Sequence, residues 1–207
     1  MKNFNQYLTE RYELNLNNSI IVDIQPEYQQ QIRFNLNEFA VYLTKLINNN
    51  KKILYYYNGQ DSLGMSSKED IIHWLLETYN FENYEEQYEE LYTILYNNII
   101  WIDKSYGFLR DFIDSGIDDA TIIKIIRYMA VNRMYSSNEI NHEEMLKITD
   151  EDLRRNEINL PPFRIDLLKQ FSGSYIMGGG INECLKEIQL IMNAFNIKYT
   201  TFQKFVY

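Results

Sequence analysis

Short apolar runs alternate with amphipathic segments along most of the chain. Four runs are rich in β-branched or aromatic residues, as buried strands of a parallel sheet are: IIVDIQ (20–25), KKILYYYNG (51–59), IIWID (99–103) and SYIMGG (174–179). A fifth strand is expected in IKYTTFQKF (197–205). The order strand, helix, strand predicts right-handed parallel crossovers. We therefore expect an α/β fold, a three-layer sandwich with a mainly parallel sheet.

Helices are predicted where apolar residues recur at helical spacing or follow a capping residue. In NLNEFAVYLTKLINNN (35–50), Phe39, Leu43 and Leu46 share one face. SKEDIIHWLLETY (67–79) opens with a serine cap and acidic residues in the first turn. Further helices are expected in YEEQYEELYTILYNN (84–98), RIDLLKQF (164–171) and NECLKEIQLIMNAFN (182–196).

The stretch from about 107 to 156 departs from this alternation. DDATIIKIIRYMAVNRMY (118–135) and NHEEMLKITDEDLRRN (141–156) both look helical, and no strand is predicted between them. We interpret the stretch as a helical insertion between the third and fourth strands. The α/β domain would then span 19–207, and 1–18 would form an N-terminal helix or leader.

The composition narrows the classes of function. The chain has 207 residues, 45% of them hydrophobic, which is enough for one large core. A formal net charge of −9 argues against a nucleic-acid or anionic-membrane partner, since both require basic patches. The chain shows no apolar run of membrane-spanning length and no apolar signal core in MKNFNQYLTE. A single cysteine forms no internal disulfide, so we expect a cytoplasmic protein.

That cysteine, Cys184, stands at the start of a predicted helix, directly after a glycine turn. The glycines Gly178, Gly179 and Gly180 allow a sharp bend and the close approach of a ligand. At a helix N-terminus, free N–H groups and the helix dipole lower a thiol pKa and favour the nucleophilic thiolate. The same N–H groups suit a developing oxyanion. A small buried cysteine behind a glycine-rich turn remains the alternative.

Two charged residues also follow predicted strands. Asp23 ends the run IIVDIQ, and Lys104 follows IIWID. Because the working sites of parallel sheets lie beyond the carboxyl ends of the strands, we expect both residues to meet Cys184 there. An acid can take the thiol proton, and a lysine can stabilise the resulting charges. Taken alone, Asp23 also fits a structural capping role and Lys104 a solvated one.

The order Asp, Lys, Cys on such a sheet resembles the isochorismatase-like, or cysteine hydrolase, superfamily. The resemblance covers roughly 19–108 and 160–207. Three motifs carry it: DIQPEY, with Asp23, Gln25 and Tyr28; DKSYGF, with Lys104 and Phe108; and GGGINEC, which ends in Cys184.

The resemblance implies a role for each of these residues. Asp23 would be the general base, Lys104 would stabilise charge and Cys184 would be the nucleophile. Contacts with the substrate or its oxyanion would come from Gly180, Ile181, Gln25 and Phe108.

Two departures from the family pattern bear on the chemistry. Glu183 directly precedes Cys184, and its charge opposes a thiolate. The nicotinamidase branch of the family binds a metal through Asp and His side chains. The two histidines here, His73 and His142, lie far apart in the sequence on predicted helices. We therefore expect no metal and no other cofactor.

A second resemblance lies at the N-terminus. MKNFNQYLTE is similar to the short amphipathic leaders of head-packaged proteins in large tailed phages, which a maturation protease cuts after a Leu-x-Glu pattern. Here the pattern LTE would place the cut after Glu10. An ordinary N-terminal helix is the alternative. A phage-encoded protein would act in the host cytoplasm or the virion.

Two functions follow from these readings. The first is a cysteine-dependent hydrolase that acts on an amide or related bond of a small-molecule substrate. The second is a non-catalytic phage accessory protein of the same fold, which binds a protein partner or a small ligand. Its surface would be the insertion and the acidic stretch ENYEEQYEE (82–90), and apolar positions in the insertion also fit a homo-oligomer. The hydrolase requires Asp23, Lys104 and Cys184 to converge beside an open pocket.

Overall fold

The fold is built on one parallel sheet. The computed structural model describes residues 16–59, 66–78, 84–104, 109–132, 141–145, 147–149, 151–152 and 163–207. Five parallel strands in this part of the chain form a sheet in the order β3-β2-β1-β4-β5. They are β1 (Ser19–Val22), β2 (Ile53–Tyr57), β3 (Ile99–Asp103), β4 (Ser174–Gly178) and β5 (Tyr199–Thr201). The strand order reverses between β1 and β4, where open α/β sheets bind ligands.

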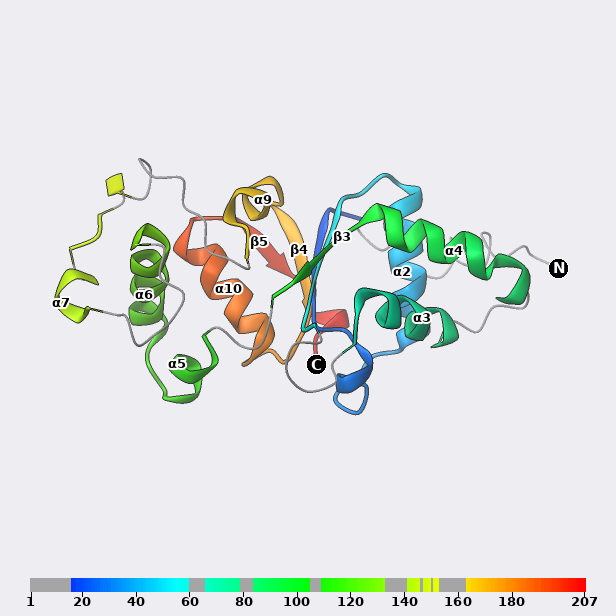
Figure 1. Ribbon diagram of the computed structural model, residues 1–207, viewed down its shortest axis with the longest axis horizontal. Coiled ribbons are helices and arrows are strands. Elements are labelled where there is room, and N and C mark those ends of the chain that lie inside the picture. The colour runs from blue at the N-terminus through cyan, green and yellow to red at the C-terminus, as the bar shows by residue number, and fades with distance from the viewer. Residues whose placement is uncertain are drawn as a thin grey trace.

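Helices cover both faces of the sheet (Figure 1), which confirms the predicted three-layer α/β fold. One layer contains α2 (Leu36–Asn48), α3 (Lys68–Thr78) and α4 (Tyr84–Asn98). The opposite side contains α5 (Arg110–Asp114), α6 (Asp119–Asn132), α7 (His142–Met145), α9 (Ile165–Gln170) and α10 (Cys184–Ala194). Short 3-10 helices, η1 (Pro26–Tyr28) and η3 (Gln203–Phe205), follow β1 and β5.

The strands separate two apolar cores because alternate side chains point to opposite faces. In β1, Ile20 and Val22 join the core under α6, α9 and α10, and Ile21 joins the core under α2, α3 and α4. All three side chains are fully buried. Burial on both faces explains why the inner strands β1, β2 and β4 lack the polar alternation of a half-exposed sheet.

Local capping bears out the predicted helix starts. Asn35 accepts a hydrogen bond from the Glu38 N–H at the start of α2. Ser67 and Asp70 exchange hydrogen bonds at the start of α3, with the Asp70 N–H donating to Ser67 Oγ and the Ser67 N–H to Asp70 Oδ2.

Two predicted elements are shorter than expected. The fifth strand ends at Thr201, because Phe202 and Phe205 turn away from the sheet edge to pack in an aromatic cluster with Tyr42. The predicted helix over 141–156 is not continuous, since α7 ends at Met145. A new turn then starts where Thr149 Oγ accepts from the Asp152 N–H.

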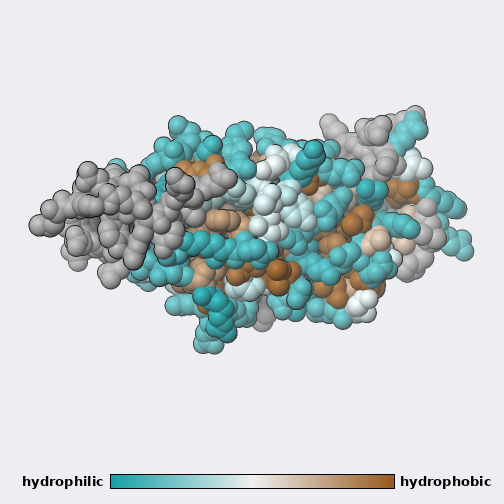
Figure 2. All heavy atoms as spheres, turned by 180° about the vertical axis from the view of Figure 1, so that it is seen from behind, coloured by the Kyte–Doolittle hydropathy of each residue, from teal (hydrophilic) through white to brown (hydrophobic). Residues whose placement is uncertain are grey.

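The expectations about the leader, the insertion and membrane spans can be compared with the described residues only. The proposed leader and its cut after Glu10 lie outside the described residues. Between β3 and α9 the described residues form helices and turns, as a helical insertion requires. Among the described helices, we find none with the length and apolar character to cross a bilayer. Figure 2 shows one face of the molecule, where hydrophobic residues form small groups among hydrophilic ones.

Candidate functional site

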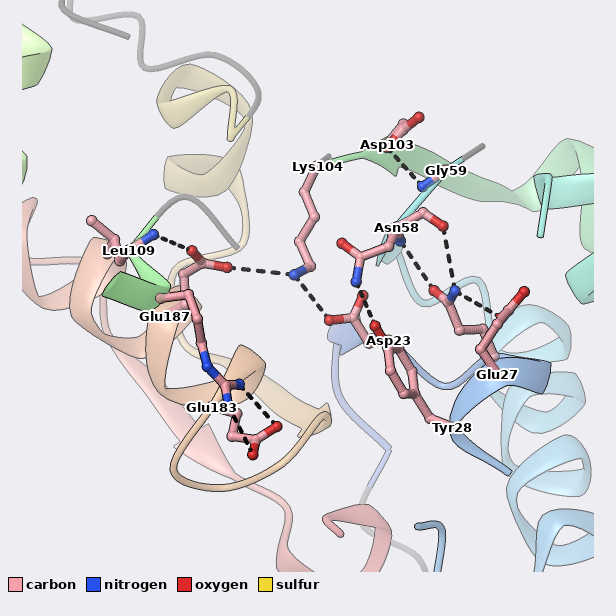
Figure 3. A network of polar contacts seen from close by, with 12 residues as sticks. Asp23, Glu27, Tyr28, Asn58, Gly59, Asp103, Lys104, Leu109, Glu183 and Glu187 are labelled. Carbon is pink, nitrogen blue, oxygen red and sulfur yellow. Dashed lines mark hydrogen bonds and ion pairs between the residues drawn. The ribbon is translucent and has the colours of Figure 1, made fainter. Parts of the chain in front are cut away.

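Asp23, Lys104 and Cys184 meet at the edge of the sheet where the strands' carboxyl ends lie, here called the carboxyl edge. Asp23 directly follows β1, Lys104 follows β3, and Cys184 is the first residue of α10 after β4. Lys104 Nζ lies 2.9 Å from Asp23 Oδ2, and both side chains are fully buried (Figure 3). Since β2 lies between β1 and β3, this ion pair spans the end of β2.

The backbone holds Asp23 in an uncommon conformation. Its φ of 48° is in the left-handed region, which Asp adopts more readily than most residues other than glycine. The Asp23 N–H still donates to Tyr56 O at 2.9 Å, so β1 stays paired with β2 up to this residue. The Asp23 carbonyl accepts a hydrogen bond of 2.6 Å from the Tyr207 hydroxyl. Both contacts fix the peptide groups of Asp23 on each side of its carboxylate.

Two glycines set the position of the turn between β4 and Cys184. Gly178 has a φ of +83°, and a Cβ there would lie 2.2 Å from the carbonyl oxygen of Val22. Gly179 has a φ of +56°, and a Cβ would lie 2.8 Å from the backbone nitrogen of Leu185. Side chains at these positions would push β4 from β1 and the turn from α10. The close approach of these backbones therefore depends on glycine.

The surroundings of Cys184 raise the pKa of its thiol, which disfavours the expected thiolate. The side chain is half-buried, and burial is the main cause that raises its pKa well above the ordinary value. The charge of Asp23 and a hydrogen bond to it raise the pKa further, and Lys104 acts in the opposite direction. Burial and the carboxylate thus outweigh the helix N-terminus and the lysine. The site therefore pairs a neutral thiol with a carboxylate placed to accept its proton.

Glu187 is a member of the site that sequence reasoning missed. Its buried carboxylate accepts a hydrogen bond from the Leu109 N–H at 2.7 Å and lies 3.4 Å from Lys104 Nζ. Burial alone would lower the pKa of Lys104, but the charges of Asp23 and Glu187 raise it above the ordinary value overall. Lys104 is thus a cation held between two buried carboxylates (Figure 3). An acidic residue on the apolar face of α10, three residues after Cys184, was the available signal.

Glu183, the other acid near the thiol, lies in a different environment from Glu187. Its side chain is exposed and pairs with Arg110, with Arg110 Nη1 3.0 Å from Glu183 Oε2. Arg110 also bonds Asp114 one turn along α5 at 2.7 Å. The acids that raise the pKa of the Cys184 thiol are Asp23 and Glu187. Glu183, which we expected to raise this pKa, is not among the causes of the shift.

Gln25 and Asn58 connect the ends of β1 and β2. Asn58 N–H donates to Gln25 Oε1 at 3.0 Å, and Gln25 Nε2 donates to Asn58 O at 3.3 Å and to Glu27 Oε2 at 2.9 Å. Asn58 Nδ2 donates to the Tyr28 hydroxyl at 2.8 Å. Gln25 was predicted to contact substrate, but in the structure its side chain holds the backbone of Asn58.

The remaining predicted contacts lie at the glycine turn and beyond β3. The Ile181 N–H, an expected oxyanion donor, donates to Tyr207 O at 3.1 Å, and the Ile181 side chain is exposed. Gly180 accepts from the Glu183 N–H at 2.9 Å. The N–H of Cys184 belongs to the first turn of α10, whose N–H groups lack carbonyl partners within the helix itself; the neighbouring Leu185 N–H donates to Gly180 O at 3.3 Å. Phe108 lies outside the described residues.

The described residues contain no group of three or more His, Cys, Asp and Glu side chains arranged to hold a metal ion. His73 contacts Tyr88 and Tyr92 between α3 and α4. The side chain of His142 lies outside the part that the structure describes. The acid, lysine and thiol at the carboxyl edge form a set suited to proton transfer and nucleophilic attack. Asp23 and Lys104 are fully buried, however, and the cavity lined by leucines of α2, α3 and α4 lies away from them, so the open pocket that the hydrolase requires is not shown beside the trio.

Comparison of the chain with models of known protein families gives no match, and comparisons with curated proteins and with solved structures give none either.

Proposed function

We propose that the protein is an isochorismatase-like cysteine hydrolase that cleaves an amide or related bond of a small molecule. The observation that carries the proposal is the convergence of Asp23, Lys104 and Cys184 at the point where the strand order reverses. Buried charges are costly, and a fold can do without them. Their placement around a thiol supports a chemical role.

The geometry supports a sequence of proton transfers through Asp23. The Cys184 thiol gives its proton to Asp23 as the sulfur attacks the substrate carbonyl carbon. The first-turn N–H of Cys184 holds the oxyanion, and Lys104 stabilises the charges around it. Asp23 then returns the proton to the leaving group, and a thioester forms on Cys184. Water, activated by Asp23, hydrolyses the thioester and restores the thiol.

A screen of small carboxamides, with released ammonia as the readout, tests the proposal. Wild-type protein should hydrolyse at least one amide, and Cys184→Ser and Asp23→Asn should each lose the activity by about a hundredfold or more. The exposed pair offers a matched control, because Glu183→Gln keeps the buried charges. Hydrolysis that survives in Cys184→Ser, or none in the wild type across the screen, would reject the proposal.

A second candidate is a non-catalytic phage accessory protein that binds a protein partner or a small ligand on the same fold. One contact favours it: Tyr207 O accepts from the Ile181 N–H, and Tyr207 N–H donates to Gly179 O at 3.4 Å. Tyr207 thus occupies a donor that the hydrolase reading assigns to the oxyanion. An absence of Cys184-dependent turnover, together with capture of a partner that Tyr207→Ala weakens, would favour this candidate.

A further inference from the structure

The segment that follows β5 turns back to the glycine turn in front of α10. Phe205, in η3, is fully buried and packs against the rings of Phe39 and Tyr42. Beyond it, Val206 packs against the core under α6, α9 and α10, and Tyr207 against the core under α2, α3 and α4. Since the sheet separates these two cores, the chain crosses from one to the other after Phe205. Phe205 is therefore an anchor, and Val206 and Tyr207 cross the carboxyl edge beyond it.

Tyr207 contacts two of the elements that carry the candidate site. Its backbone bonds the glycine turn: Tyr207 O accepts from the Ile181 N–H at 3.1 Å, and the Tyr207 N–H donates to Gly179 O at 3.4 Å. Its hydroxyl donates to Asp23 O at 2.6 Å. Gly179 and Ile181 belong to the turn that leads into Cys184, and Asp23 follows β1. Tyr207 thus joins the approach to the thiol with the acid.

The phenol ring of Tyr207 lies beside the thiol as well as beside the acid. Burial is the main cause that raises the pKa of Tyr207 above its ordinary value, and the charges of Asp23 and Cys184 raise it further. The same two groups act on the pKa of Tyr28, whose ring centroid is 6.4 Å from that of Tyr207. Such effects fall off with distance, so both rings border the site. Tyr207 is therefore part of what surrounds the half-buried Cys184.

The contacts of Tyr207 with the site are few compared with those of its anchor. Three hydrogen bonds hold it, and the one to Gly179 O is longer than most backbone hydrogen bonds. A net hydrogen bond changes an equilibrium by only about two- to tenfold. Phe205, in contrast, has no exposed surface and sits among several aromatic rings. A rotation of Val206 and Tyr207 about Phe205 would release all three bonds and leave the core intact.

We propose that Val206 and Tyr207 form a strap that closes the site and controls access to Cys184. With the strap closed, Tyr207 O occupies the Ile181 N–H and the phenol ring lies beside the thiol. With the strap open, the Ile181 N–H is free to bind a carbonyl oxygen and the thiol is reached from solvent. The strap does not depend on the chemistry of Cys184, so it applies to a ligand-binding protein as well as to a hydrolase.

Two rates that require the same opening test the strap. Amide hydrogen exchange at Ile181 is followed by NMR, and alkylation of Cys184 by iodoacetamide is followed by mass spectrometry. Tyr207→Phe removes the bond to Asp23 O, so it should raise both rates by about fivefold, and Tyr207→Ala should raise them further. The Asn58 N–H, held by the Gln25 side chain at the same edge, is the internal control and should exchange as in wild type.

The matched control variant is Tyr96→Phe, which makes the same change on α4, where the Tyr96 hydroxyl accepts from Lys68 Nζ. It should leave both rates unchanged. If Tyr207→Ala fails to fold, as judged by circular dichroism, Tyr207→Phe decides alone.

Each discordant outcome overturns the strap. Exchange at Ile181 as fast as in an unfolded peptide would show that Tyr207 does not hold the turn in wild type. Faster alkylation without faster Ile181 exchange would mean that Tyr207 changes only the pKa of the thiol. Faster exchange without faster alkylation would mean that Tyr207 does not cover Cys184. Neither rate requires turnover, so the strap can fail while the hydrolase stands, and it can stand if the hydrolase fails.

Discussion

Among the described residues, the buried polar side chains at the amino edge of the sheet are two serines, whereas those at the carboxyl edge include three charged residues. Ser19 and Ser174 begin β1 and β4. Ser19 Oγ donates to Asn17 O at 3.0 Å and lies 3.2 Å from the Tyr42 hydroxyl. The opposite edge buries Asp23, Lys104, Glu187, Gln25 and Asn58.

The difference between the edges separates the polar side chains that the fold requires from those that it only tolerates. Both edges must pair the free backbone groups of the same strands, and at the amino edge neutral side chains are sufficient. Asn18 Oδ1, for example, accepts the Lys52 N–H at 3.0 Å. The carboxyl edge adds buried charges, a left-handed Asp23 and, within the described residues, a buried Asn58 Oδ1 without a hydrogen-bond partner, none of which strand pairing needs. Such features concentrate at functional sites, which is why we place function at this edge.

Of the substitutions that test the difference between the two edges, Lys104→Met should have the largest effect on stability. In Lys104→Met, Asp23 and Glu187 stay buried without a cation, and the free energy of unfolding at neutral pH should fall by about 3–5 kcal/mol. Urea unfolding followed by circular dichroism measures it. The triple variant that also carries Asp23→Asn and Glu187→Gln removes all three charges and should recover most of the loss. A loss below about 1 kcal/mol in the single variant, as for a surface ion pair, would contradict the account.

A second prediction concerns the reactivity of Cys184. Burial and Asp23 raise its pKa, so at neutral pH iodoacetamide should alkylate the folded protein more slowly than the urea-unfolded chain. Asp23→Asn removes a charge that opposes the thiolate and leaves Lys104, which favours it. The rate should then rise about tenfold for each unit by which the pKa falls. Ser174→Ala, at the other edge, is the matched control and should react as wild type does. Slower alkylation of Asp23→Asn would show that Asp23 activates the resting thiol instead.

At the amino edge the expected effects are smaller. Ser19→Ala removes neutral hydrogen bonds only and should lower the free energy of unfolding by about 1 kcal/mol. The same urea titration checks it. A loss comparable to that of Lys104→Met would mean that the two edges do not differ as described.

The smallest effect is expected at Ser174. Its buried Oγ has no hydrogen-bond partner in the described part of the chain. Removing an unpartnered hydroxyl costs no hydrogen bond, so Ser174→Ala should change the free energy of unfolding by less than about 0.5 kcal/mol or increase it slightly. Thermal unfolding against wild type provides the measurement. A clear destabilisation would reveal a partner at this position.

Much of the framework is predictable because local patterns set it. Burial on both faces makes the inner strands β1, β2 and β4 continuous apolar runs, and caps such as Ser67 set the helix starts. The meeting of Asp23 and Lys104 follows from one rule, since residues after parallel strands share an edge. The predicted fifth strand extends to Phe205 and is too long. Phe205 packs in an aromatic cluster with Phe39 and Tyr42, and strand propensity alone cannot distinguish such an apolar residue from one inside a strand.

The sequence could not predict the properties of the site that depend on tertiary packing. The helix N-terminus predicted a thiolate at Cys184, but burial and a neighbouring carboxylate depend on the assembled fold and reverse the sign. Glu187 resembles an ordinary acid of a surface helix until its face of α10 is seen to be buried. Asn58 sits in a plain Asn-Gly turn sequence, and only the strand order places it between Asp23 and Lys104.

The central claim, that the carboxyl edge is built for covalent catalysis by Cys184, is tested most directly by trapping the acyl-enzyme. The protein is incubated with p-nitrophenyl acetate, quenched in acid and weighed intact by mass spectrometry, in wild type, Cys184→Ser and Asp23→Asn. We predict one acetyl group on wild type, mapped to Cys184, none on that residue in Cys184→Ser, and slower turnover of the adduct in Asp23→Asn. Acetylation confined to surface lysines and unaffected by either substitution would contradict the claim.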